Sequence, residues 1–375
     1  MLISARAVQG VGAALVAPAT LSIITTTFEE GAERNKALGI WGAVAGSGAA
    51  AGVLFGGILT RYFGWSWIFF VNVPVGAAVL AASRPIIRES RDAAERNFDL
   101  LGAATVTGGL ALLVYAVAEA PTHGWGATST IVSLIGAVAL LVAFVVREAT
   151  AAAPLMPLQI FRIRTVTGAN AASVLLGAVV FASFFLLTLY VQDVLHYSAL
   201  KTGVTFLAAA GTSVVVSVVA QSVITHIGAR PVFAVGFALM TASMIFFSQV
   251  PVHGKFASDL LPGYLLMGVG LACAFIAASI SALAGVSRDL AGVASGLLNT
   301  SQQVGGAIGT AVVSSVSLTR ANHLLKIGHS PEAAFTSGYS LAFWLLAGVA
   351  AAGIAVSLVL IHPQHETLPQ AELAR

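Results

Sequence analysis

The chain has 375 residues, of which 18 are Lys or Arg and 15 are Asp or Glu, so that 9% are charged and 58% are hydrophobic. Soluble domains carry about 25% charged residues, so these proportions exclude an ordinary water-soluble surface, and the hydrophobicity excludes disorder. The single cysteine, Cys273, excludes a disulfide scaffold and cysteine metal clusters, and a net charge of +3 is too small for a nucleic-acid-binding face.

Membrane-spanning helices are predicted wherever about 20 mostly apolar residues form a charge-poor window. Eleven such windows follow one another along the chain, at 2–24, 38–60, 67–82, 100–118, 129–146, 165–190, 203–224, 231–250, 260–286, 291–317 and 337–361. The third window is the shortest and contains Pro74, which a membrane helix can tolerate. We therefore expect an all-α fold, a polytopic transmembrane helical bundle.

The positions of the cations predict the orientation, because short cytoplasmic loops are enriched in Lys and Arg. One set of alternate loops holds Arg34, Lys36, Arg84, Arg88, Arg91, Arg96, Arg147, Arg162, Arg164, Arg230, Arg288 and Arg375, and the other holds Arg61, Lys201, Lys255, Arg320 and Lys326. This imbalance predicts a multi-pass protein of the cell membrane with its C-terminus in the cytoplasm. Because eleven is odd, Met1 would then lie outside.

Two breaks divide the windows into three groups. The stretch 84–97 is the most charged and is typical of a solvated linker, and 147–164 contains Pro154, Pro157 and an amphipathic run that suggests a short helix on the membrane surface. The predicted domains are 1–83 with three spans, 84–164 as a central two-span insertion with its linkers, and 165–375 as a six-helix bundle with a short cytoplasmic tail.

Arg6 is the one charge well inside a predicted span, where it should be paired or line a wet cavity. Gln9 follows at i+3 on the same helix face, and Gly10 would allow another helix to approach closely. The alternative is that Arg6 extends its guanidinium to the membrane surface, since it is only about one turn from the start of the window.

The second window is rich in glycine, and spacing of four residues places small residues on one helix side. Its glycines are Gly39, Gly42, Gly46, Gly48, Gly52, Gly56 and Gly57. Such a stripe would serve as a static seam or as a sliding contact between moving halves.

These residues resemble a known family. Arg6, Gln9 and Gly10 look like motif B of the major facilitator superfamily, and the glycine helix ending in Gly56 and Gly57 looks like its antiporter motif C. The sequence WSWIFFVNVPVG at 65–76 is similar to a signature of the fourteen-helix drug:proton antiporters of the EmrB/QacA type. Segments that fit the same branch lie at 154–162, 189–192 and 291–306.

The resemblance implies that the eleven spans correspond to helices four to fourteen of that architecture. The first three helices would be absent, together with the membrane acid of helix one to which the family resemblance assigns proton coupling. Val53 stands where motif C has a proline, and Ser66 replaces an arginine of the signature.

Candidate substrate contacts lie in two later windows. Phe181, Phe184 and Phe185 share a helix face and could form the floor of an apolar drug pocket, although aromatic side chains facing lipid are an equal alternative. Asn299 and Gln303, at i and i+4, could face a substrate path, whereas amides inside spans usually hold helices together. No metal site is expected, because the histidines are scattered over loops and span ends.

The leading hypothesis is a secondary active transporter that exports amphipathic drugs or antibiotics by alternating access. The proton gradient would drive export, and no cofactor is expected. The drug class and the proton coupling are what the resemblance implies. Its partners would be membrane lipid, a small amphipathic substrate and protons, with no nucleic acid, and the oligomeric state is left open. Arg6, Gln9 and Gly10 would take part in coupling, and Gly42, Gly46, Gly52, Gly56 and Gly57 in the contact between bundles. The alternative is a truncated, non-transporting membrane fragment that needs upstream helices or a partner chain. A membrane enzyme is a third possibility, disfavoured by the lack of acid and base pairs inside the spans.

Overall fold

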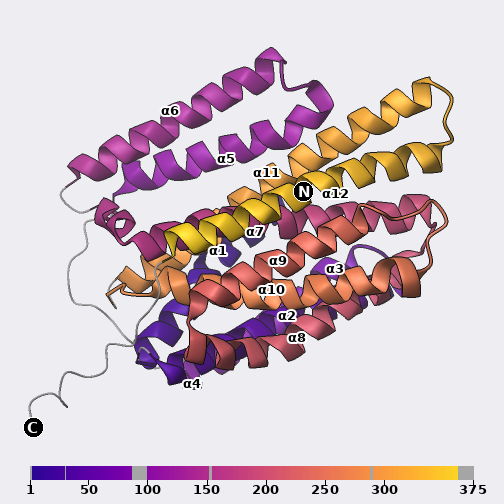
Figure 1. Cartoon of the computed structure of the whole chain (residues 1–375). Coiled ribbons are helices and arrows are strands. Elements are labelled where there is room, and N and C mark those ends of the chain that lie inside the picture. The colour runs from indigo at the N-terminus through magenta and orange to yellow at the C-terminus, as the bar shows by residue number, and fades with distance from the viewer. Residues whose placement is uncertain (1, 30, 87–98, 152–153, 288–289, 362–375) are drawn as a thin grey trace, which may run out of the picture.

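The computed structural model describes residues 2–29, 31–86, 99–151, 154–287 and 290–361 (Figure 1). Within these ranges every regular element is a helix. The long helices are α1 (Leu2–Thr27), α2 (Ala32–Tyr62), α4 (Asn72–Ile86), α5 (Leu100–His123), α6 (Thr128–Thr150), α7 (Arg164–Leu189), α8 (Ala199–Ile227), α9 (Ala229–Phe247), α10 (Leu261–Leu283), α11 (Ala291–Lys326) and α12 (Pro331–Leu360). Short helical turns are α3 (Trp67–Phe70), η1 (Leu158–Arg162), η2 (Tyr190–Val194) and η3 (Phe256–Leu260).

Each of the eleven predicted windows coincides with a helix or, for the third, with the pair α3 and α4. This pair is divided at Val71, and the side-chain amide of Asn72 donates to the carbonyl of Ile68 at 3.0 Å. Pro74 falls in the first turn of α4, where a missing N–H leaves no helical hydrogen bond unmade. The apolar pattern therefore located every long helix in the described ranges, and the proline is accommodated at a helix start.

Nine helical segments in the described ranges are long and apolar enough to cross a membrane. The windows in α2 and α11 are not among these nine. Both helices instead make extensive contacts inside the protein, α2 with α8 and α11 with α7. Their small residues favour close packing over contact with lipid.

The core lies among α7 to α12, where α7 packs against α11 and α12, and α9 packs between α10 and α12. Aromatic rings fill its centre: the Phe247 ring lies 5.4 Å from that of Tyr264 and 5.6 Å from that of Phe343. All three side chains are fully or almost fully buried. The six-helix group expected over 165–375 thus contains most of the apolar side chains that are removed from the surroundings.

The first four helices contribute much less buried surface. α1 packs mainly on α11, and α2 packs on α8 and α10, while α3 and α4 contain no buried residue. α4 extends to Ile86, two residues beyond the expected start of the charged linker, and 87–98 lie outside the described residues. The short helix expected near Pro157 is present as the tight turn η1, which begins directly after that proline and buries Ile160.

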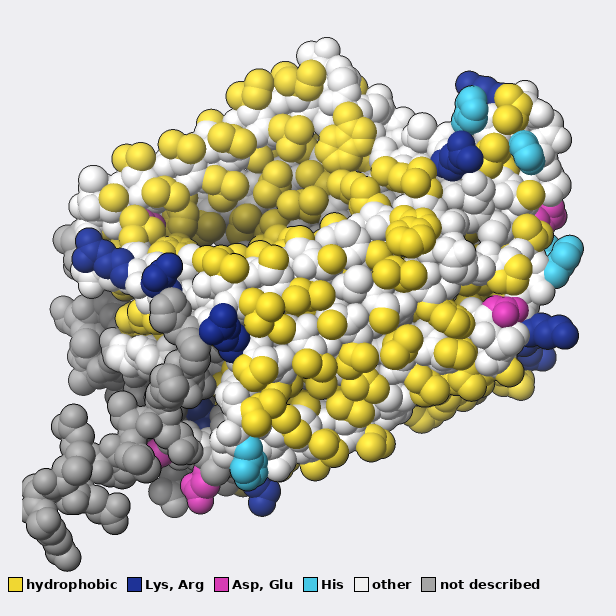
Figure 2. All heavy atoms as spheres, viewed as in Figure 1, with side chains coloured by type: hydrophobic (Ala, Val, Ile, Leu, Met, Phe, Trp, Pro, Cys, Tyr) yellow, Lys and Arg dark blue, Asp and Glu magenta, His cyan; other side chains and the backbone are white. Residues whose placement is uncertain are grey.

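The hairpin formed by α5 and α6 lies along one side of the bundle, next to α11 (Figure 1). Figure 2 shows that charged side chains gather at the two ends of the helices, with hydrophobic side chains between them. The contacts agree with this alternation, because Arg230 at the start of α9 donates to the carbonyl of Leu358 at the end of α12. At the opposite end, the Tyr190 hydroxyl donates to the Pro251 carbonyl at 2.6 Å.

Candidate functional site

Arg6 is paired within its own helix and with the signature segment. Its Nη1 donates to Oε1 of Gln9 at 2.6 Å, and its guanidinium carbon lies 5.8 Å from the centre of the Phe69 ring. The spacing of three residues places both polar groups on one face of α1, as the sequence predicts. A cation over an aromatic face is attracted by the ring, so Arg6 has two local partners although its side chain is exposed.

The expected close approach at Gly10 is not found. A Cβ atom placed on Gly10 would meet nothing within 4 Å, so no described helix packs against this position. α1 contacts the rest of the protein chiefly through α11, and residues 8–16 of α1 are exposed. Small size permits a close contact but does not create one, and the part expected of Gly10 in coupling stays a prediction.

The glycine helix α2 meets α8 along a close seam. A Cβ atom on Gly57 would lie 3.1 Å from Cα of Leu200, and one on Gly39 would lie 2.8 Å from Cβ of Gln221. Gly42 faces α10 as well, where its Cβ atom would lie 3.3 Å from a side-chain carbon of Ile276. The two helices therefore approach so closely that a methyl group has no room.

The same helix has a second glycine face that is open. Cβ atoms on Gly48, Gly52 and Gly56 would meet nothing within 4 Å. Gly46 and Val53 also lie in α2, but their surroundings are outside the described residues. The predicted stripe thus divides, and its 48/52/56 part packs against no described helix.

The three candidate phenylalanines do not form one floor. The Phe184 ring lies 5.2 Å from that of Phe206 in α8, and Phe185 packs half-buried against the core. Phe181 is 48% exposed and covers Gly306 of α11, whose Cβ atom would lie 2.5 Å from the Phe181 ring. Their common helix face therefore spreads over two neighbouring helices, and their contact with a substrate stays a prediction.

The two candidate amides of α11 have different surroundings, since Asn299 is half-buried and Gln303 is exposed. A polar contact that the sequence analysis missed lies between them: Oγ of Ser301 donates to Oδ1 of Asn170 in α7 at 3.1 Å. The Gln302 side-chain nitrogen is buried without a partner in the described part of the chain. The polar residues of α11 thus divide between an interhelical contact and the surface.

α7 and α11 meet through their backbones. A Cβ atom on Gly305 would overlap the backbone of Val174, and one on Gly177 would overlap the backbone of Gln302. A Cβ atom on Gly309 would lie 2.6 Å from Cα of Ala178. The spacing of four between Gly305 and Gly309 was the available sequence signal for this seam.

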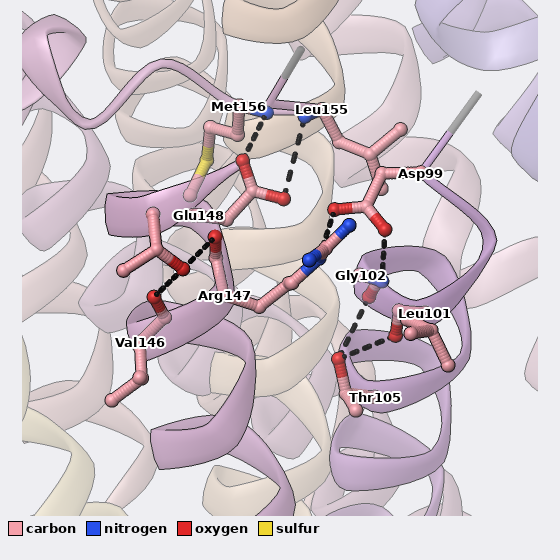
Figure 3. A network of polar contacts seen from close by, with 10 residues as sticks. Asp99, Leu101, Gly102, Thr105, Val146, Arg147, Glu148, Leu155 and Met156 are labelled. Atoms are coloured by element: carbon pink, nitrogen blue, oxygen red, sulfur yellow. Dashed lines mark hydrogen bonds and ion pairs between the residues drawn. The ribbon is translucent and has the colours of Figure 1, made fainter. Parts of the chain in front are cut away.

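A polar clamp, formed by Asp99, Arg147 and Glu148, was also missed (Figure 3). Oδ1 of Asp99 accepts the backbone N–H of Gly102 at 3.0 Å, which caps α5, and Oδ2 accepts Nε–H of Arg147 in α6 at 2.9 Å. The Gly102 N–H and, next, the Arg147 guanidinium hold the pKa of Asp99 below its usual value. The aspartate before an apolar helix was a capping signal, but its partner is 48 positions away.

Glu148 completes the clamp toward the following linker. Its two carboxylate oxygens accept the backbone N–H groups of Leu155 at 3.3 Å and Met156 at 2.9 Å (Figure 3). The carboxylate is buried, with 4% of the residue exposed. The clamp therefore fixes one end of the α5–α6 hairpin to the segment that leads into α7.

None of these groups suggests a resident metal. In the part of the chain that the structure describes, no three His, Cys, Asp or Glu side chains gather closely enough to hold a metal ion. The described acidic side chains lie near helix ends, and Glu119 pairs with His123 at 2.9 Å. What the arrangement offers chemically is a paired arginine in α1, and a glycine seam between α2 and α8.

Comparison with known proteins identifies a family. The Major Facilitator Superfamily profile matches residues 1–310. The puromycin resistance protein pur8 of Streptomyces alboniger is 37% identical over 97% of this chain and 74% of its own length. The tetracenomycin C resistance and export protein of Streptomyces glaucescens is 34% identical over 84% of this chain and 58% of its own, and the cephamycin export protein CmcT of Amycolatopsis lactamdurans is 38% identical over 84% and 66%.

Proposed function

Because this chain belongs to the Major Facilitator Superfamily, we propose that it is a secondary transporter that exports amphipathic antibiotics or drugs from the cytoplasm, as a fourteen-helix antiporter of the EmrB/QacA type does. The similar proteins named for puromycin resistance and for tetracenomycin C export support the substrate class. The chain spans between 58% and 74% of the length of the three relatives described above, so an activity of the whole relative is a proposal for this chain.

The observation that carries the proposal is the glycine seam between α2 and α8. It joins the first group of helices to the six-helix group by close contact, at Gly57 against the backbone of Leu200 and at Gly39 against the side chain of Gln221. Transporters of this kind work by rocking one helical group against another around a central site. A contact without bulky side chains suits a surface along which two groups of helices must change their angle.

Arg6 is proposed to couple proton movement to this rocking. Arginine side chains keep their positive charge in proteins, so coupling through Arg6 works by an exchange of partners. Both of its described partners, Gln9 and the Phe69 ring, are neutral, which leaves the positive charge uncompensated. A charge held in an apolar span without an anionic partner is poised to attract a carboxylate when that group loses its proton.

Uptake of radiolabelled puromycin into inside-out vesicles tests both the transport and its energy source. An imposed proton gradient should drive accumulation, and nigericin, which dissipates that gradient, should abolish it. The Arg6→Lys variant keeps the charge and should retain part of the uptake, whereas Arg6→Ala should lose it. Parental uptake by Arg6→Ala would remove Arg6 from the mechanism. Uptake that nigericin leaves unchanged would refute proton coupling.

A second candidate function is that of a membrane protein that transports only when further helices cover its open faces. It is favoured by the exposed α3 and α4, which bury no residue, and by the open Gly48, Gly52 and Gly56 face of α2. Purified chain in liposomes distinguishes the two candidates. Puromycin accumulation by this chain alone would contradict the second candidate, and its absence from a folded preparation would favour it.

A further inference from the structure

A groove opens between the tip of the α5–α6 hairpin and the pair α11 and α12. It encloses about 740 Å³ and is lined by Trp125, Val312, Val316, Arg320, His323 and Leu341, among others. Of the lining residues, the hairpin contributes Trp125, and α11 and α12 contribute the others. None of the five predicted substrate-contact residues belongs to its lining, so the groove is separate from the proposed substrate path.

The lining of the groove changes in character along α11. Val312 and Val316 form its apolar part, with the half-exposed Leu341 opposite on α12, and Arg320 and His323 follow toward the helix end. At 1.5 Å per residue the distance from Val312 to Arg320 is about 12 Å along the helix axis. One leaflet of the hydrocarbon core is about 15 Å thick, so the stretch from Val312 to Arg320 covers most of the thickness of a lipid tail region.

The polar end of the groove carries positive charge. Nε of Arg320 donates to the Ser337 hydroxyl at 3.3 Å, and in the described ranges no carboxylate forms an ion pair with this guanidinium. Of the acids near the hairpin tip, Glu119 is already paired with His123. The remaining N–H groups of Arg320 can therefore bind an anion at the level of the headgroups.

Trp125 lines the groove on the side of the hairpin tip. Its indole Nε1 donates to the Ser315 hydroxyl at 2.9 Å, which ties the hairpin tip to α11 while the ring stays 42% exposed. Tryptophan is enriched where a membrane meets water, because its ring is apolar and its N–H is polar. The contact with Ser315 thus places Trp125 in the wall of the groove, at the height of Val312 and Val316 along α11.

We propose that this groove binds one anionic phospholipid, with the phosphate on Arg320 and an acyl chain along Val312, Val316 and Leu341. The charge favours an anionic headgroup over a cationic amphipathic drug, and the apolar depth favours a lipid over free phosphate. The lipid fills the space between the hairpin and α11, so it supports the hairpin from below. This site requires only that the protein lies in a membrane, and it does not depend on what is transported.

Native mass spectrometry of the purified full chain tests the site. The protein is offered equal amounts of dioleoyl phosphatidylglycerol and dioleoyl phosphatidylcholine, and retained lipid is counted. Arg320→Ala removes a charge-assisted hydrogen bond and should lower phosphatidylglycerol retention about tenfold. Lys326→Ala is the matched control, since Lys326 is an exposed cation at the same helix end that does not line the groove.

A second variant tests the apolar part independently of charge. Val316→Trp should fill the groove and abolish retention of either lipid, while thermal unfolding in detergent alone verifies that each variant is folded. Equal retention of the two lipids, equal loss in Arg320→Ala and Lys326→Ala, or normal retention by Val316→Trp would overturn the proposal. So would displacement of the lipid by inorganic phosphate, which would indicate a plain anion site, or by puromycin, which would indicate a substrate site.

Discussion

Gly56 and Gly57 are sequence neighbours with opposite surroundings, and this makes them a matched pair for testing the α2–α8 seam. The Cβ atom of an alanine at 57 would lie 3.1 Å from Cα of Leu200 and 3.3 Å from the carbonyl oxygen of Ala199. Carbon atoms pack favourably at about 3.5–4.0 Å, so α8 must withdraw by roughly 0.5 Å. Both close atoms belong to the backbone, so no side chain can rotate away. At Gly56 the same methyl group meets nothing within 4 Å.

The expected difference between the two variants follows from two opposing contributions. Alanine gains about 1 kcal/mol over glycine inside a helix, and this gain is common to both positions. Overpacking costs about 1–3 kcal/mol and applies only at position 57. Gly56→Ala should therefore be about 1 kcal/mol more stable than the parent, and Gly57→Ala should be up to about 2 kcal/mol less stable.

Unfolding of the purified variants in mixed micelles, titrated with dodecyl sulfate, measures this difference. The helix-propensity gain cancels when the two variants are compared with each other, so the overpacking cost remains. Puromycin uptake should fall in Gly57→Ala more than in Gly56→Ala if the seam moves during transport. Equal unfolding free energies for the two variants would refute the seam, because the structure gives the two methyl groups different neighbours.

Three further predictions concern polar contacts. The pKa of Asp99 is lowered by the Gly102 N–H in the first turn of α5 and then by the Arg147 guanidinium. Asp99 therefore stabilises the fold at pH values above its ordinary pKa of 3.8, and this stabilisation is lost as the pH falls through the lower pKa of the folded state. Acid unfolding should be steeper in the parent than in Asp99→Asn, and identical acid profiles would contradict this. Asn170→Ala removes the hydrogen bond to Ser301 and should cost about 0.6–2 kcal/mol in the same micelle titration, whereas an unchanged midpoint would exclude that contact. Trp125→Phe keeps an aromatic ring but removes the indole N–H that donates to Ser315, so spin labels on the hairpin tip and α11 should show a broader distance distribution. An unchanged distribution would show that the bond does not hold the tip.

The helices could be predicted from the sequence because a membrane span requires length and apolarity, which are local properties. All eleven windows contain helices, and the proline of the third lies at the start of α4. Which neighbours the two glycine-rich windows pack against could not be inferred from hydropathy alone. α2 packs extensively on α8, and α11 packs extensively on α7.

The candidate site was predictable only where its geometry is local. The i and i+3 spacing of Arg6 and Gln9 is sufficient to bring them together on a helix. Which glycines meet a neighbour depends on the position of that neighbour, so Gly10 and Gly57 were given the same expectation and have opposite surroundings. Asp99 and Arg147 come together only after α5 and α6 have formed a hairpin, and no spacing rule reaches that distance.

Both ends of the α5–α6 hairpin are attached to the six-helix group. Glu148 binds the segment that leads into α7, and Trp125 binds Ser315 of α11. The hairpin must therefore travel with the six-helix group whenever that group tilts. A fluorescent dye on the hairpin would report such tilting without any label in the transport path. Energy transfer from the hairpin to α4 should vary between states, while transfer from the hairpin to α12 should stay constant.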